Sequence, residues 1–248
     1  MPVGRSRCQI DILSVLIYIP TYRNDLSGIA MSPASEMLKT TEAAVVSRVA
    51  LRDVNRAIDE GILPEGFFTH DDGRLVLAAA CTLISFYFES AKSLTSEERL
   101  FVIKVAVPRL RRSVSFELPA LVAVDWIIQH EFLTIDFAPF VRGAVERLGG
   151  LARARRLVHS SPEILGGTPV IRGTRIPVYD VAASAAAGIS TERILAAYPG
   201  LDTEKIELAT IFAQANPPRG RPRTAGSELP TGAVIVSDHR RPRRKKAK

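Results

Sequence analysis

The segment of residues 159–181, HSSPEILGGTPVIRGTRIPVYDV, constrains the fold of this chain more than any other stretch. Each glycine supplies a positive φ and each proline fixes φ near about −65°, so this spacing demands tight turns. Between the turns, the apolar pairs Ile164-Leu165 and Val170-Ile171 are typical of short strands. We predict a small β-element with a Gly-Gly turn and a Gly-Thr turn, and with Arg172 and Arg175 near its tip.

Three helical patterns follow this β-element, over residues 181–187, 190–198 and 202–213. Gly188 and Pro199-Gly200 end the first two patterns, and Asp202 is a suitable cap for the third. Residues 157–216 are therefore expected to form a trihelical domain of helix-turn-helix type.

The sequence PEILGGTPVIRGTRIPVYDV, with the helical patterns after it, resembles the bacterial domain-of-unknown-function family numbered four-three-three. Its core, GGTPVIRGTRIPV, is long and unusual, and the resemblance covers residues 157–216. That family is associated with VapB-type antitoxins of toxin–antitoxin operons. The resemblance implies a ribonuclease toxin of the PIN type as partner, an enzyme whose clustered carboxylates hold Mg²⁺.

A second helix-turn-helix is indicated near the N-terminus. A helical pattern begins at Thr40 and breaks at residues 47–49, and a second one covers residues 51–60 before Gly61. Asp71-Asp72-Gly73 then predicts a hairpin turn, which would form a wing. Residues 38–92 resemble the winged helix-turn-helix of MerR-like and excisionase-like DNA binders.

The exposed face of the second helix would carry Arg52, Asn55 and Arg56, side chain types that read base edges and bind phosphates. A structural or partner-docking role stays open, because acidic residues dilute this face. Arg172 and Arg175 likewise have two interpretations. They would contact phosphates or carboxylates of a partner, or form internal salt bridges to Asp180 or Glu163.

The positive charge is concentrated at the C-terminus. Residues 216–248 hold ten of the 33 Lys/Arg and two of the 26 Asp/Glu, so the rest of the chain is close to neutral. The tail, residues 217–248, is rich in proline, glycine and arginine and is expected to be disordered alone. Electrostatic attraction to an anionic partner is therefore expected from the tail.

Two functions are open for this tail besides non-specific attraction to nucleic acid. Its sequence PRGRP matches the core of an AT-hook, a peptide that binds A·T minor grooves. By the antitoxin resemblance, Arg219, Arg221 or Arg223 would enter the carboxylate cluster of the toxin, and Val234, Ile235 and Val236 would add a strand to its sheet.

The remaining segments are less patterned. Residues 1–37 are expected to be an N-terminal extension, with a later start codon, a short β-segment or a disordered arm as alternatives. Residues 75–90 predict an apolar helix, and residues 93–156 a mixed connecting region that could dimerise. Within that region, residues 141–158 predict a basic helix interrupted by Gly149-Gly150.

The sequence gives no indication of an enzyme or of a cofactor. The four histidines lack partners at telling spacings, and Cys8 and Cys81 form no metal-binding motif. The N-terminal apolar run is too short to span a bilayer, and a reducing cytoplasm is the expected compartment.

We thus expect a mainly α fold with short β-hairpins (α+β). Its expected function is that of a homodimeric antitoxin that neutralises a PIN-like ribonuclease toxin and binds operator DNA. A stand-alone DNA-binding transcription regulator is the alternative, and a dimerising scaffold is a third possibility.

Overall fold

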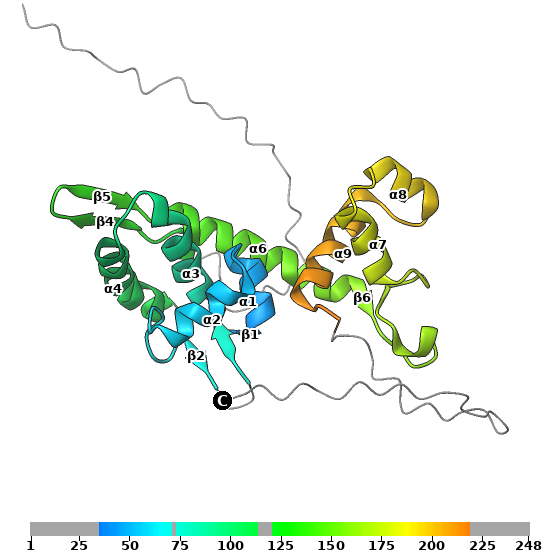
Figure 1. Cartoon of the computed structure of the whole chain (residues 1–248), viewed down its shortest axis with the longest axis horizontal. Coiled ribbons are helices and arrows are strands. Elements are labelled where there is room, and N and C mark those ends of the chain that lie inside the picture. Colours follow the sequence, from blue (N-terminus) through cyan, green and yellow to red (C-terminus); the bar gives the residue numbers. More distant parts are fainter. Residues whose placement is uncertain (1–34, 71–72, 114–120, 219–248) are drawn as a thin grey trace, which may run out of the picture. The chain divides into compact units, whose positions relative to one another are not determined.

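The computed structural model describes residues 35–70, 73–113 and 121–218 (Figure 1). These residues form a mostly helical structure with short antiparallel strand pairs, which confirms the expected α+β class. Segments 1–34 and 219–248 lie outside the described residues. So do Asp71 and Asp72 of the predicted hairpin turn.

The first elements are two helices joined by a short turn and a three-stranded antiparallel sheet of order β1-β3-β2. The apolar residues Leu38, Val54, Ala57 and Val76 are fully buried between these elements. The elements are β1 (Met37–Lys39), α1 (Thr40–Ser47), α2 (Leu51–Asp59), β2 (Phe68–Thr69), β3 (Leu75–Leu77) and α3 (Ala80–Glu89).

The prediction of a helix over residues 75–90 was wrong for its first turn. Leu75–Leu77 forms β3, the central strand, and the helix begins only at Ala80. Val76 faces both Leu38 of β1 and Phe68 of β2 in register. A short apolar run is compatible with a buried strand or a buried helix. Here the run forms a strand because it pairs with β1 on one side and with β2 on the other.

The residues that follow complete the same apolar core. Trp126 is buried within it and donates its indole N–H to the carbonyl of Leu121 at 2.7 Å. Residues of the predicted segments 38–92 and 93–156 therefore pack together in one core. The added elements are η1 (Ser90–Lys92), α4 (Ser96–Ser113), β4 (Ile127–His130), β5 (Leu133–Asp136) and α6 (Ala138–Leu157).

Helix α6 is continuous, which corrects the expected interruption at Gly149-Gly150. Gly150 is buried where α6 packs against α9, and a Cβ there would lie 3.6 Å from Cδ1 of Ile211. Glycine weakens a helix by about 1 kcal/mol relative to alanine. Packing against α1, α3 and α9 offsets this cost, so the glycine pair does not break the helix.

Two arginines fix α6 to α1 and its neighbouring elements. Arg155 pairs with Glu42 of α1 at 2.9 Å and with Glu36 before β1. Burial opposes the charge of Arg155, but hydrogen bonds to the two carboxylates leave its pKa raised. Arg147 donates from Nε to the carbonyl of Val46 and lies within 3.4 Å of the Ser85 hydroxyl.

The last elements form a separate, smaller apolar core that includes Ile171, Val178, Val181, Ile194 and Ile206. Strands β6 and β7 pair antiparallel, and positive φ angles occur at Gly166, Gly167 and Gly173, as the turn prediction requires. The elements are β6 (Val158–His159), η2 (Leu165–Gly167), β7 (Val170–Ile171), α7 (Val178–Ala186), α8 (Thr191–Ala197) and α9 (Thr203–Ala215).

The glycines of α6 give a direct stability test. In Gly149→Ala the added Cβ would meet only Arg153 Nη1, at 3.7 Å, so the gain in helix propensity should raise the free energy of unfolding by about 0.5–1 kcal/mol. The control Gly143→Ala would place a Cβ 2.9 Å from Arg147 Nη1 and should yield no such gain. Urea unfolding followed by circular dichroism measures both. Equal stabilisation of the two variants would contradict the packing described.

Cys81 is expected to be inert in the folded chain. It is fully buried in α3, and burial raises the pKa of its thiol to about 12 from 9.0. Since this pKa is higher than in the unfolded chain, alkali above about pH 9 should destabilise the folded state through this group. In a Cys8→Ser chain at pH 8, maleimide should label Cys81 only after denaturant is added. Rapid labelling without denaturant would contradict the burial.

Candidate functional site

Helices α1 and α2 meet in a tight turn at Arg48. This residue has φ 57° and ψ 40°, in the left-handed region, and its N–H bonds the carbonyl of Val45 at 3.2 Å. Val49 N–H bonds Ala44 carbonyl at 3.1 Å, which closes the turn. The turn directs α2 so that Val54 and Ala57 are buried while its other face is open to solvent.

Three of the five residues predicted to contact DNA lie on or beside this open face of α2. The side chain of Arg52 is 88% exposed and its nearest carboxylate, Asp53, is 3.7 Å away. Arg56 pairs with Glu60 at 2.8 Å, and this hydrogen bond is the largest cause of its raised pKa. Asn55 is less exposed and donates to the carbonyl of Leu51 at 3.1 Å. Arg52 is thus the most accessible of the three.

Arg74, which the sequence reasoning missed, joins the β2–β3 hairpin to α2. Its Nη1 donates to Asn55 Oδ1 at 3.2 Å, and its Nη2 pairs with Asp59 at 2.8 Å. The only signal in the sequence was its place directly after the predicted hairpin turn. Arg74 therefore orients the Asn55 amide and holds the hairpin beside the exposed face of α2.

Each guanidinium group of this face lies beside a carboxylate: Arg52 by Asp53, Arg56 by Glu60 and Arg74 by Asp59. Exposed ion pairs contribute only about 0–1 kcal/mol each, so these pairs hold the side chains weakly. Together, Arg52, Arg56 and Arg74 place three guanidinium groups on α2 and the hairpin next to it. Such a group of donors suits a phosphate backbone.

Arg172 has a structural role that neither interpretation of the sequence included. Its Nε donates to the carbonyl of Arg156 at 2.9 Å, and its backbone N–H bonds Leu157 carbonyl at 2.7 Å. Its guanidinium therefore caps the C-terminal end of α6, where a cation is favoured. Among the described residues, neither Asp180 nor Glu163 forms an ion pair with it.

Arg175 is exposed on the loop between β7 and α7. Arg172 and Arg175 belong to the smaller core's elements, whereas α2 belongs to the larger core. The structure thus does not join the five predicted DNA-binding residues into one cluster of contacts.

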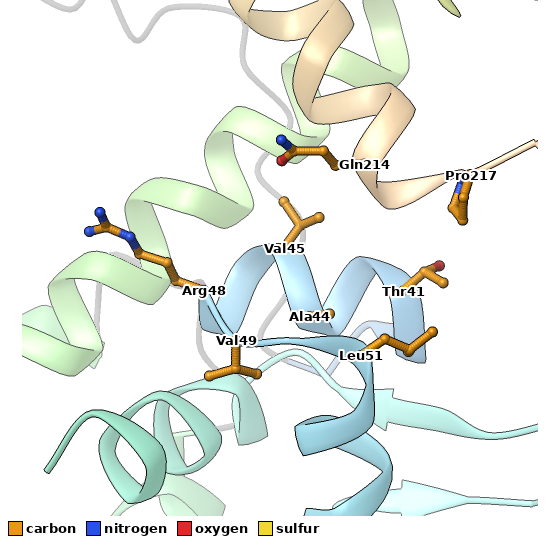
Figure 2. A pocket seen from close by; sticks show the side chains of 8 residues that line it. All are labelled: Thr41, Ala44, Val45, Arg48, Val49, Leu51, Gln214 and Pro217. Carbon is orange, nitrogen blue, oxygen red and sulfur yellow. The ribbon is translucent and has the colours of Figure 1, made fainter. Parts of the chain in front are cut away.

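A groove of about 370 Å³ lies between α1, the turn at Arg48 and the C-terminal end of α9. Thr41 closes one end by donating its hydroxyl to Ala215 carbonyl at 2.6 Å, and Tyr179 donates to Asn216 carbonyl at 2.8 Å. Figure 2 shows the lining: Thr41, Ala44, Val45, Arg48, Val49, Leu51, Gln214 and Pro217. This groove could not be predicted, because its two walls are over 160 residues apart in the chain.

The predicted toxin-binding residues Arg219, Arg221, Arg223, Val234, Ile235 and Val236 lie outside the described residues. Within the described part of the chain, no three His, Cys, Asp or Glu residues are grouped as metal ligands. Nor does any helix in that part have the length and apolar character needed to cross a membrane.

Comparisons with known proteins agree with the C-terminal resemblance. Residues 158–213 match the family described as "Protein of unknown function (DUF433)". Nearly the whole chain is similar to "Uncharacterized protein y4eO" of Sinorhizobium fredii (strain NBRC 101917 / NGR234). The two are 65% identical over 216 residues, which cover 87% of this chain and 97% of that protein. The chain therefore belongs to the same family as that protein. No solved structure matches it.

The two arginines near α6 differ in their contacts and form a matched pair for mutation. Arg172→Ala should lower the free energy of unfolding by about 1 kcal/mol, because the last carbonyls of α6 lose their charged donor. Arg175→Ala is exposed and should change stability by less than about 0.5 kcal/mol. Urea unfolding measures both. A larger loss for Arg175→Ala than for Arg172→Ala would contradict the capping role.

Proposed function

We propose that this protein binds DNA through α2 and the β2–β3 hairpin and acts as the antitoxin of a toxin–antitoxin pair. The observation that carries the DNA-binding part is the tie from Arg74 to Asn55 and Asp59. It holds a hairpin beside the exposed face of a helix that follows a tight turn. Such a pair can enter a groove and contact the flanking backbone together.

The order β1-α1-α2-β2-β3 supports this proposal, because the hairpin follows the second helix as a wing does. Arg52 near the start of α2 is suited to a base edge, since the N-terminal residues of a recognition helix reach deepest into the major groove. Arg56 and Arg74 are suited to phosphates. Binding as a homodimer would extend the contact over two half-sites.

The antitoxin part rests on the family match at residues 158–213 and on the basic tail. A PIN-like ribonuclease presents carboxylates, and an arginine from residues 219–223 would pair with them in a bidentate manner. The strand-forming run Val234-Ile235-Val236 would add to the edge of the toxin sheet. DNA binding and toxin binding are thereby assigned to different parts of the chain.

The DNA-binding proposal predicts a graded response to mutation. With an operator selected from random DNA at fixed salt, Arg52→Ala and Arg56→Ala should each weaken binding by about five- to one-hundred-fold. Arg175→Ala, an exposed arginine away from α2, is the control and should bind normally. Fluorescence anisotropy gives the affinities. Unchanged affinity in both α2 variants would overturn the proposed DNA interface.

The antitoxin role is tested by coexpression with the neighbouring nuclease gene. Arg219→Ala, Arg221→Ala and Arg223→Ala combined should abolish neutralisation while DNA binding by α2 remains. Full neutralisation by a chain that ends at Pro217 would exclude the tail mechanism. If no nuclease copurifies but operator binding is specific, the chain is a stand-alone transcription regulator.

A further inference from the structure

We propose that the groove between α1 and α9 is occupied by a segment of this same chain, residues 233–238 (AVIVSD). This docking would bring the basic run at residues 240–246 beside α2. The inference rests on the proposed function and adds to it: residues 234–236 would occupy the groove in the chain alone and would leave it when they add a strand to the toxin sheet. The chain itself suggests the occupant, because Pro217 lines the groove and residues 219–248 continue directly from that point.

The groove has the chemistry to hold an apolar segment. Its floor and sides include Ala44, Val45, Val49 and Leu51, and Leu51 is 42% exposed although it is a large apolar side chain at the start of α2. Within residues 219–248, Ala233-Val234-Ile235-Val236 is the one run of consecutive apolar residues. Covering Leu51 and Val45 with these side chains would remove apolar surface from water.

The length of the groove agrees with the length of the extended segment. Residues 41–48 of α1 and its turn span about 10 Å at 1.5 Å per helical residue. An extended chain from Val234 to Asp238 covers about 13 Å at 3.3 Å per residue. Figure 2 places Pro217 and Thr41 at one end of the groove and Arg48 at the other. A segment that begins at the Pro217 end would therefore bring Asp238 to Arg48.

Charge fixes the direction of the segment. Arg48 is exposed, and among the described residues it forms no ion pair. Asp238 is one of two acidic residues in the tail, and it directly follows the apolar run and Ser237. Gln214 on the opposite wall has an amide that can bond the backbone of an extended segment.

The consequence concerns DNA affinity. The chain outside residues 216–248 is close to neutral, so a basic run placed beside α2 would add phosphate contacts to those of the three arginines there. With Asp238 at Arg48, the sequence RRPRRKK begins two residues further on, next to the turn that leads into α2. Docking in the groove would thus place the basic run at residues 240–246 along the DNA backbone.

The test uses the full chain with Cys8→Ser and Ser237→Cys, and a nitroxide label at residue 237. Buried Cys81 should not take the label. Without DNA, the methyl signals of Val45, Val49 and Leu51 should lose about half their intensity or more. In the control Val234→Ser/Ile235→Ser/Val236→Ser, which keeps every tail charge, this loss should disappear.

A charge exchange tests the direction. Arg48→Asp alone should weaken the signal loss, and aspartate tolerates the left-handed backbone at this position. Adding Asp238→Arg should restore it. Signals unaffected by the label, or equal loss in the triple serine variant, would overturn the proposal. In a mixture of nitroxide-labelled chains and separate isotope-enriched chains, an equal loss of the methyl signals would mean that a second copy occupies the groove. That result would overturn the proposal as well.

The DNA experiment separates this inference from the proposed function. The triple serine variant should bind the operator with a salt slope smaller by about two, the equivalent of two lost phosphate contacts. Signal loss in a chain that fails to bind DNA would leave the groove assignment intact and overturn the proposed function. An unchanged salt slope in the serine variant would overturn the inferred role of the docking.

Discussion

The packing of α9 against α6 at Gly150 is the contact on which the rest of the structure depends. Gly150 is buried at this contact, and a Cβ added there would lie 3.6 Å from Cδ1 of Ile211, an ordinary van der Waals distance. The end of α9 belongs to the larger core, where Ala215 is fully buried. The hydroxyl of Thr41 then bonds the carbonyl of Ala215. Helix α9 is thereby joined to α1.

The arginines of α6 illustrate how basic residues can serve the interior. In the sequence they form a basic helix, which is a common feature of nucleic-acid binders. In the structure, Arg147 bonds the carbonyl of Val46, and Arg155 pairs with Glu36 and Glu42. Removing a single partner from the Arg155 cluster would leave a poorly compensated charge in a partly buried place. These cations therefore fix α6 to α1 and are not available to a phosphate backbone.

Much of the fold could be predicted from local signals. The break at residues 47–49 and Gly61 predicted where α1 and α2 end. The cap at Asp202 and the apolar residues after it predicted α9. For residues 75–77 the sequence carried two conflicting predictions, a hairpin strand after the Asp-Asp-Gly turn and the start of an apolar helix, and the pairing with β1 and β2 decides for the strand. The continuity of α6 could not be predicted, since Gly150 is supported by contact with a helix over 50 residues later.

For the candidate site, the residue types on α2 were predictable but their partners were not. Arg74 reaches Asn55 and Asp59 only after the hairpin has folded back. Arg172 finds carbonyls of α6 instead of the carboxylates suggested by the sequence, because the β6–β7 pairing brings it to the end of that helix. Strand pairing between distant residues thus decides which arginines form contacts within the chain.

Gly150→Leu tests most directly whether α6 and α9 couple the two cores. Trp126, the single tryptophan, reports on the larger core, and hydrogen exchange of α7 and α9 amides reports on the smaller one. If α6 and α9 couple the two cores, Gly150→Leu should lower the free energy of unfolding reported by Trp126 and the free energy of exchange of the α9 amides, by about 1–3 kcal/mol each. Gly149→Leu, which faces no side chain of α9, should spare both. Loss of α9 protection with an unchanged Trp126 transition would contradict the coupling.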